Sequence, residues 1–151
     1  MKTDMDKKFE NKRKEFESAC RKKGLALTIQ RRAILEALAS RTDHPTVDQL
    51  YDDIKDKLKG VSRTTVYRVL ETFVSIGIAK KVSNPDSTAR FDADTIRHHH
   101  MVCNNCGKVM DLYDHTLDDL VPVVEPLPEF EITDYSITFT GLCADCRKCN
   151  K

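Results

Sequence analysis

The most informative segment of the chain runs His98-His99-His100-Met101-Val102-Cys103-Asn104-Asn105-Cys106-Gly107. It sets three of the five histidines directly before a Cys-x-x-Cys knuckle. Imidazoles and thiolates are the side chains that bind divalent transition metals at neutral pH. A second knuckle, Cys143-Ala144-Asp145-Cys146, lies near the C-terminus. The pattern predicts two metal sites in the second half: a closed one, whose coordination positions are all filled by protein, and an open one. The first half is then expected to carry the activity that the metal controls.

The two knuckles supply four cysteines, with 36 residues between the pairs. Two intervening residues allow both sulfurs of a knuckle to reach one ion, and two knuckles complete a tetrahedron. Zn²⁺ is the expected occupant, with a small iron–sulfur centre as the alternative. Four thiolates leave no open coordination position, so the predicted role is structural. The predicted ligands are Cys103, Cys106, Cys143 and Cys146. Cys20 is expected to be a packed thiol, and Cys149, a thiol of the C-terminal tail, has no assigned role.

The charges of the two halves differ in sign, although the formal net charge of the whole chain is only +1. Residues 1–83 hold 19 Lys and Arg against 12 Asp and Glu, whereas residues 84–151 hold 6 against 12. A basic half favours a polyanion-binding module joined to a different module. Two ordinary solvated surfaces of opposite sign remain the alternative, because charge alone does not separate the two interpretations.

The first residues of the chain are charged, and no apolar run approaches the roughly 20 residues of a membrane span. At 151 residues the chain is one domain or two small ones. We therefore expect a cytoplasmic protein with no membrane partner. Thiols stay reduced in the cytoplasm, so the paired knuckles predict metal binding rather than disulfides.

Apolar periodicity in the first half predicts four helices, over residues 4–23, 30–40, 46–60 and 62–76. Thr46 lies three residues before Gln49, which is the spacing of a capping box. Ser62 can cap the fourth helix, and Gly77 can end it. The third and fourth helices, joined by a short turn that contains glycine, form a predicted helix-turn-helix unit.

The first turn of the fourth predicted helix carries exposed side chains that suit phosphates, base edges and thymine methyls. These are Arg63, Thr64, Tyr67 and Arg68. After this helix, residues 78–83 and 88–92 flank the turn Asn84-Pro85-Asp86-Ser87 and are expected to form two strands. A helix-turn-helix followed by a hairpin is a winged helix. The alternative is a small helical bundle whose exposed arginines only increase solubility.

The second half offers weaker signals of secondary structure. Residues 93–101 are expected to be a short, histidine-rich linker. Strands are expected over residues 108–113 and 131–140, with a short helix over 115–124 between them. This half is too small to bury much core alone, so it needs a metal, a partner chain or both.

Three motifs occur in order along the chain: Thr64-Thr65-Val66-Tyr67-Arg68-Val69-Leu70, Arg90-Phe91-Asp92 and His98-x-His-x-x-Cys-x-x-Cys-Gly-x-x-x-Asp111. Together they resemble the ferric uptake regulator (Fur) superfamily of bacterial metal-responsive repressors, from about Gly24 to Cys146. The resemblance implies an α+β protein with an N-terminal winged helix-turn-helix DNA-binding domain over residues 1–92 and a hinge at about 93–99. A small C-terminal α/β dimerisation domain with the structural zinc would follow over residues 100–151. It also implies a homodimer that binds double-stranded operator DNA and is not an enzyme.

The resemblance further implies a regulatory site for Fe(II) or Mn(II), made of His44, Asp92, His98, His100 and Asp111. His99, between two of these ligands, is not expected to join them. Three imidazoles and two carboxylates suit these ions better than a soft thiolate cage. Because the set draws on the DNA-binding half, the hinge and the dimerisation half, a bound ion would fix the angle between domains. In a dimer this angle would decide whether both recognition helices reach successive major grooves, about 34 Å apart.

Asp92 favours the peroxide-sensing branch of the superfamily, because iron-uptake regulators usually carry Glu at this position. In that branch Fe(II) reacts with hydrogen peroxide, a ligand histidine matching His44 or His98 is oxidised, and repression ends. Mn(II) supports DNA binding there but resists the oxidation. The alternative is a reversible Fe(II)-responsive iron-uptake repressor without peroxide sensing.

The chain departs from the pattern of the superfamily in two respects. Ala26 and Ile29 stand where many relatives carry a minor-groove cation and a proline, which puts operator affinity or sequence preference in doubt. No histidine follows His115, so the extra metal site of some relatives is expected to be absent or degraded.

Two other classes of function are less compatible with the sequence. A metal-dependent hydrolase would need a general base beside an open zinc, and no His-Glu-x-x-His motif occurs. A zinc-stabilised module that only dimerises would predict that Mn(II) leaves DNA affinity unchanged.

Overall fold

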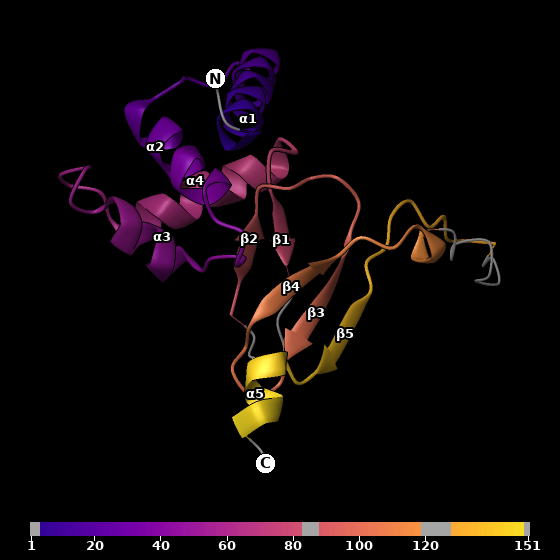
Figure 1. Cartoon of the computed structure of the whole chain (residues 1–151). Helices are drawn as coiled ribbons and strands as arrows, with labels where there is room; N and C mark the ends of the chain where they lie inside the picture. Colours follow the sequence, from indigo (N-terminus) through magenta and orange to yellow (C-terminus); the bar gives the residue numbers. More distant parts are fainter. Residues whose placement is uncertain (1–3, 83–87, 119–127, 150–151) are drawn as a thin grey trace. The chain divides into compact units, whose positions relative to one another are not determined.

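The computed structural model of the chain describes residues 4–82, 88–118 and 128–149 (Figure 1). It divides into two compact units, an N-terminal unit of residues 1–95 and a C-terminal unit of residues 96–151. Within these described residues, the N-terminal unit shows helices and a two-stranded sheet, and the C-terminal unit shows a three-stranded sheet. The predicted α+β class is therefore confirmed.

In the described residues of the N-terminal unit there are four α-helices, which are α1 (Asp4–Lys22), α2 (Ile29–Ala39), α3 (Val47–Ile54) and α4 (Arg63–Ser75). Hydroxyl side chains cap three of them, as the sequence predicts for α3 and α4. The Thr46 hydroxyl accepts from Gln49 N while the Gln49 side chain accepts from Thr46 N, so the capping box is present. The Ser62 hydroxyl accepts from Thr65 N at the start of α4.

The two helices of the helix-turn-helix end differently. Gly77, at φ +76°, ends α4: Ile78 N donates to Phe73 O and Gly77 N to Val74 O, the pair of bonds of a Schellman motif. The helix α3 stops at Ile54, earlier than its predicted end near residue 60. Lys57 N and Leu58 N both donate to Ile54 O, so the chain leaves the helix in turns. Leu58 still packs against the core.

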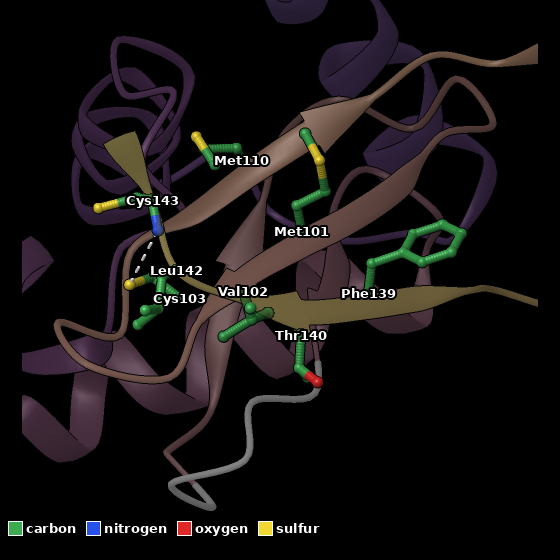
Figure 2. Close-up of a pocket in the computed structure, with 9 residues that line it drawn as sticks. Met101, Val102, Cys103, Met110, Phe139, Thr140, Leu142 and Cys143 are labelled. Carbon is green, nitrogen blue, oxygen red and sulfur yellow. Dashed lines mark hydrogen bonds between the residues drawn. The ribbon is translucent and has the colours of Figure 1, made fainter. Parts of the chain in front are cut away.

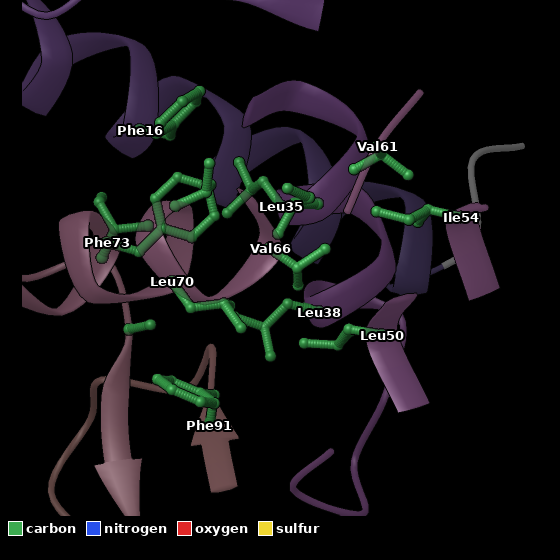
Figure 3. Packing of buried hydrophobic residues seen from close by; sticks show 14 of the residues in the cluster. Phe16, Leu35, Leu38, Leu50, Ile54, Val61, Val66, Leu70, Phe73 and Phe91 are labelled. Carbon is green, nitrogen blue, oxygen red and sulfur yellow. The ribbon is translucent and has the colours of Figure 1, made fainter. Parts of the chain in front are cut away.

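The core of the N-terminal unit brings together apolar residues from all four helices and from the hairpin (Figure 3). The rings of Phe16 from α1 and Phe73 from α4 meet edge to face, with centroids 5.2 Å apart. Cys20 lies in this core, and burial raises the pKa of its thiol. The core therefore fixes α4, with its exposed first turn, on the other helices.

The hairpin of the N-terminal unit pairs β1 (Lys80–Val82) antiparallel with β2 (Arg90–Asp92). Phe91 of β2 is fully buried and belongs to the helical core, which anchors the hairpin after α4. Helix-turn-helix followed by this hairpin is the predicted winged helix. The predicted turn over residues 84–87 lies outside the described residues.

The C-terminal unit holds β3 (His99–Cys103), β4 (Val109–Leu112) and β5 (Thr138–Gly141), in the sheet order β4-β3-β5. β3 pairs antiparallel with β4 and parallel with β5. A single 3₁₀ turn, η1 (His115–Leu117), follows β4, and the helix α5 (Ala144–Cys149) follows β5.

Three predictions for the C-terminal unit are wrong in extent. Residues 99–101 are not linker but the start of the central strand, because their histidines are buried in the sheet. The predicted strand over residues 131–140 is regular only from Thr138, where pairing with β3 begins. The predicted helix over residues 115–124 is a 3₁₀ turn through Leu117, and residues 119–124 lie outside the described residues.

Candidate metal centres

The four predicted zinc ligands lie together in the C-terminal unit. Cys103 ends β3, Cys106 follows in the turn before β4, and Cys143 and Cys146 flank and enter α5. Their sulfurs all lie within 4.8 Å of one another, and Cys106 Sγ and Cys143 Sγ are 3.8 Å apart. A ZnS₄ tetrahedron with bonds of about 2.3 Å has edges of about 3.8 Å. The donor set and its spacing therefore fit a zinc ion.

Backbone amides and neighbouring sulfurs act in opposite directions on these thiols. Cys143 N donates to Cys103 Sγ at 3.3 Å, a hydrogen bond marked in Figure 2. This bond, followed by those from Cys106 and Asn105, lowers the pKa of Cys103 to about 6. The Asn105 side chain favours the thiolate of Cys146, but the other three sulfurs and burial together raise its pKa to about 12. Closely packed sulfurs cannot all become thiolates without a neighbouring positive charge. A divalent cation supplies this charge and so favours the thiolate form.

The N-terminal unit contributes a histidine–carboxylate pair. His44 Nε2 lies 3.6 Å from Asp92 Oδ2, and both side chains are buried. His44 has φ +53°, a left-handed conformation that is uncommon outside glycine and is often found at functional sites. Arg90 donates to His44 O, and Phe91 N donates to Pro45 O. The strand β2 therefore holds both the strained histidine and its carboxylate.

The C-terminal unit contributes a second group, made of His98, His100 and Asp111. His98 Nε2 lies 3.4 Å from Asp111 Oδ1, and the rings of His98 and His100 have centroids 4.8 Å apart. His100 of β3 is the direct cross-strand partner of Asp111 of β4. Adjacent ligands around one ion lie about 3 to 3.5 Å apart when metal–ligand bonds are about 2.1 Å. The group therefore has the spacing of part of a nitrogen/oxygen coordination shell.

A backbone contact settles which nitrogen of His98 can act as a ligand. His98 Nδ1 lies 2.8 Å from Ile96 O, so Nδ1 carries the proton and donates it to the carbonyl. Nε2, which lies on the side of Asp111, is therefore the nitrogen that a metal ion would bind. Fixing the tautomer through the second ring nitrogen is the usual support of a metal-binding histidine.

His99 is engaged elsewhere. Its Nδ1 accepts a hydrogen bond from Ile137 N at 3.3 Å, and its Nε2 lies 3.5 Å from Asp118 Oδ1. Its ring stacks on that of Tyr135 at 6.1 Å. Alternation along β3 explains the separation, because neighbouring residues of a strand point to opposite faces.

The four residues predicted to meet DNA, Arg63, Thr64, Tyr67 and Arg68, are all exposed in the first two turns of α4. Lys81 of the hairpin lies 5.7 Å from the centroid of the Tyr67 ring and pairs with Glu71. A cation of the hairpin and the exposed face of α4 therefore border one surface.

Two supporting groups of the candidate ligands were not singled out from the sequence, namely Ile96 O, which orients His98, and Asp94 N, which donates to Asp92 Oδ1 at 2.8 Å. Both are backbone atoms. Every residue type offers such atoms, so no sequence signal could have marked them.

Within the described part of the chain, no helix combines the length and apolar character that crossing a bilayer would require.

The sequence profile of the ferric uptake regulator family matches residues 22–140. The peroxide-responsive repressor PerR of Staphylococcus epidermidis is 34% identical over 131 residues, which cover 87% of each chain. The structure of the Helicobacter pylori ferric uptake regulator shares the fold, with a TM-score of 0.74 at 20% identity over 92% of this chain and 93% of that one. The manganese-containing ferric uptake regulator of Pseudomonas aeruginosa is 28% identical, with a TM-score of 0.67 over 85% of this chain and 97% of that one. The chain therefore belongs to the ferric uptake regulator family, whose members are metal-responsive transcriptional repressors and not enzymes.

Proposed function

We propose that the chain is a homodimeric, metal-dependent repressor of the cytoplasm that binds operator DNA and senses hydrogen peroxide. In this proposal a structural zinc ion is held by Cys103, Cys106, Cys143 and Cys146. A regulatory Fe(II) or Mn(II) ion is held by His44, Asp92, His98, His100 and Asp111. The N-terminal unit reads DNA, and the C-terminal unit dimerises.

The exposed side chains at the start of α4 support the assignment of DNA binding. Arg63 and Arg68 provide charge for phosphates or guanine, whereas Thr64 and Tyr67 provide polar and apolar contacts for base edges. The N-terminal unit also carries the basic half of the chain, which favours association with a polyanion.

The division of the regulatory ligands between the two units supports the assignment of metal control. Asp92 ends the hairpin of the N-terminal unit, and His98 stands at the start of the C-terminal unit. An ion that engaged both groups would restrict the linker between these residues. Such coupling is expected to contribute about 1–3 kcal/mol to DNA binding, a 5- to 150-fold change in affinity.

The free edge and the apolar face of the C-terminal sheet support the assignment of a homodimer. β5 is an edge strand, so one side of its backbone is unpaired in the described sheet. Phe139 and Leu142 are each 44% exposed beside Met101 and Met110, and together they line a shallow cavity of about 140 Å³ (Figure 2). A second copy of the chain would cover this apolar surface. Covering it would stabilise a unit that is too small to bury much apolar area by itself.

Asp92 is the observation that carries peroxide sensing. Its short side chain matches the peroxide-sensing branch of the family, and PerR of S. epidermidis is named a peroxide-responsive repressor. Bound Fe(II) would supply the redox chemistry. One oxygen atom of hydrogen peroxide is transferred to the ring of His44 or His98, and the other leaves as water. The oxidised ring is a poorer ligand, so the regulatory ion would dissociate from its site and DNA affinity would fall.

The mass of the protein before and after brief exposure to peroxide tests this proposal. Fe(II)-loaded and Mn(II)-loaded protein are compared by intact mass and peptide mapping. The expected result is a gain of one oxygen on a peptide with His44 or His98, in the Fe(II) form only. If the Fe(II) form gains no oxygen on histidine, peroxide sensing is excluded and reversible iron sensing becomes the better proposal. Oxidation confined to the four cysteines with loss of zinc would make the cysteine cluster the switch.

A further inference from the structure

Two residues of α3 hold Arg63, the first residue of α4. Arg63 Nε donates a hydrogen bond to Asp48 Oδ1 at 2.5 Å, and the guanidinium carbon lies 4.4 Å from the centroid of the Tyr51 ring. Asp48 and Tyr51 are three residues apart, so they share one face of α3. The carboxylate fixes one edge of the guanidinium, and the ring restrains its plane.

The hydrogen bond to Asp48 leaves the other end of Arg63 available. Within the part of the chain that the structure describes, the two terminal nitrogens of Arg63 donate no hydrogen bond. The side chain is 58% exposed, at the start of the helix that carries Thr64 and Tyr67. Two parallel N–H groups at the end of a guanidinium match the O6 and N7 acceptors of guanine in the major groove.

We infer that Asp48 and Tyr51 are positioning residues that orient Arg63 for bidentate recognition of one guanine in each half-site. The inference rests on the proposed function and assigns residues of the first helix of the helix-turn-helix to sequence preference. An unrestrained arginine would bind any nearby phosphate, and this contact carries no sequence information. The Asp48 carboxylate beside Nε disfavours phosphate binding in two ways, because it neutralises the positive charge of Arg63 and repels phosphate.

A contribution to stability alone would not explain this arrangement. Asp48 is 71% exposed, and an ion pair between exposed side chains contributes little to folding. Asp52 on α3 and Lys55 just after it form an ordinary exposed ion pair of this kind. In the described residues, Lys55 makes no cation–π contact with an aromatic ring. Arg63 differs because two groups restrain it at the surface predicted to face bases.

The experiment compares base preference in matched variants. The Mn(II)-loaded wild-type protein first selects duplexes from a random-sequence library. Affinity is then measured for the selected duplex, for variants with each G·C pair replaced, and for a random-sequence duplex. The variants are Asp48→Asn, Tyr51→Leu and Arg63→Lys, with Asp56→Asn as the control, because it removes the same charge from the turn after α3. Thermal unfolding and manganese content confirm that each variant is folded and loaded.

We expect one G·C pair per half-site whose replacement costs the wild type about tenfold in affinity, the size of one bidentate contact. In Asp48→Asn, Tyr51→Leu and Arg63→Lys this loss shrinks to about threefold or less. Asp48→Asn also binds the random-sequence duplex about twofold more tightly, as an exposed charge near phosphate predicts. Asp56→Asn keeps the base preference of the wild type.

Two results would overturn the inference, and they can be told apart. If the wild type selects a sequence but Asp48→Asn and Tyr51→Leu keep the same preference at every pair, the positioning role is excluded and the proposed function stands. If the Mn(II)-loaded wild type selects no sequence, the inference and the proposed function fail together.

Discussion

Asp92 divides its two carboxylate oxygens between different partners: Oδ1 accepts a hydrogen bond from Asp94 N at 2.8 Å, and Oδ2 lies 3.6 Å from His44 Nε2. The first contact orients the carboxylate and the second brings it beside an imidazole. A side chain one methylene longer would place its carboxylate differently relative to both partners. The geometry of the histidine–carboxylate pair therefore depends on the length of this residue.

Asp92→Glu is expected to separate metal binding from peroxide sensitivity. Glutamate keeps the charge, so Mn(II)-dependent DNA binding should remain within about threefold of wild type, whereas histidine oxidation in the Fe(II) form should slow by about tenfold because ligand geometry changes. Quenched-flow peptide mapping measures the rate. Asp94→Glu, which leaves the Asp94 amide in place, serves as the control. Equal oxidation rates in wild type and Asp92→Glu would contradict the role given to Asp92.

His98→Asn should weaken the binding of the regulatory metal without unfolding the chain. The variant removes Nε2, the proposed ligand atom, and we expect Mn(II) affinity to fall by at least about 100-fold. Competition with a metal-binding dye measures the affinity. His115→Asn is the matched control, since the His115 side chain is 98% exposed. A wild-type Mn(II) affinity in His98→Asn would remove His98 from the ligand set.

Cys103→Ser should remove the zinc and destabilise the C-terminal unit. Structural zinc in small domains binds with about 10–16 kcal/mol, so its loss is expected to unfold the sheet that Cys103 ends. Zinc content by mass spectrometry and thermal unfolding report the two effects. Cys149→Ser, at an exposed cysteine outside the cluster, should keep one zinc per chain and the wild-type melting temperature. A zinc-replete Cys103→Ser protein would refute the assignment.

Phe139→Asp should convert the proposed dimer into monomers. A charge at this position would be buried in the interface that a second copy would form over β5, where an unpaired charge is costly. Sedimentation velocity distinguishes the species. Phe130→Asp carries the same change at a residue that is 66% exposed and lies outside the sheet, and it should remain dimeric. If both variants sediment as the wild type does, the interface lies elsewhere.

Gly77→Ala should destabilise the N-terminal unit by about 1 kcal/mol, because an L-residue is strained at φ +76°. No atom lies within 4 Å of the added Cβ, so the cost is conformational and not steric. Gly141→Ala, which also has open space and lacks a positive φ, should change stability by less than about 0.5 kcal/mol. Urea unfolding measures both, and equal effects of the two substitutions would argue against a conformational cost at Gly77.

The helix-turn-helix was predictable because its signals are local. Caps such as Thr46 and Ser62 mark helix starts, and Gly77 marks an end, with no help from distant residues. The cysteine cluster was predictable for a different reason, since the spacing of thiolates within a knuckle restricts what they can bind.

The central strand was not predictable by the same means. His99 and His100 give β3 the polarity of a loop, and only their burial between β4 and β5 makes the segment a strand. The early end of α3 and the late start of β5 likewise depend on packing and pairing. The ring contact of Arg63 with Tyr51, twelve residues apart, follows from how α3 meets α4, which apolar periodicity alone does not fix.

The five-residue strand β3 has a cysteine of the zinc cluster at one end and a histidine of the regulatory group near the other. Zinc would hold the strand in register at Cys103 and thereby keep His100 opposite Asp111. In a cell short of zinc, the regulator would then be unable to bind its regulatory metal. The protein would report iron status or oxidative stress only while another nutrient is in sufficient supply, so its output would combine two environmental conditions in one molecule.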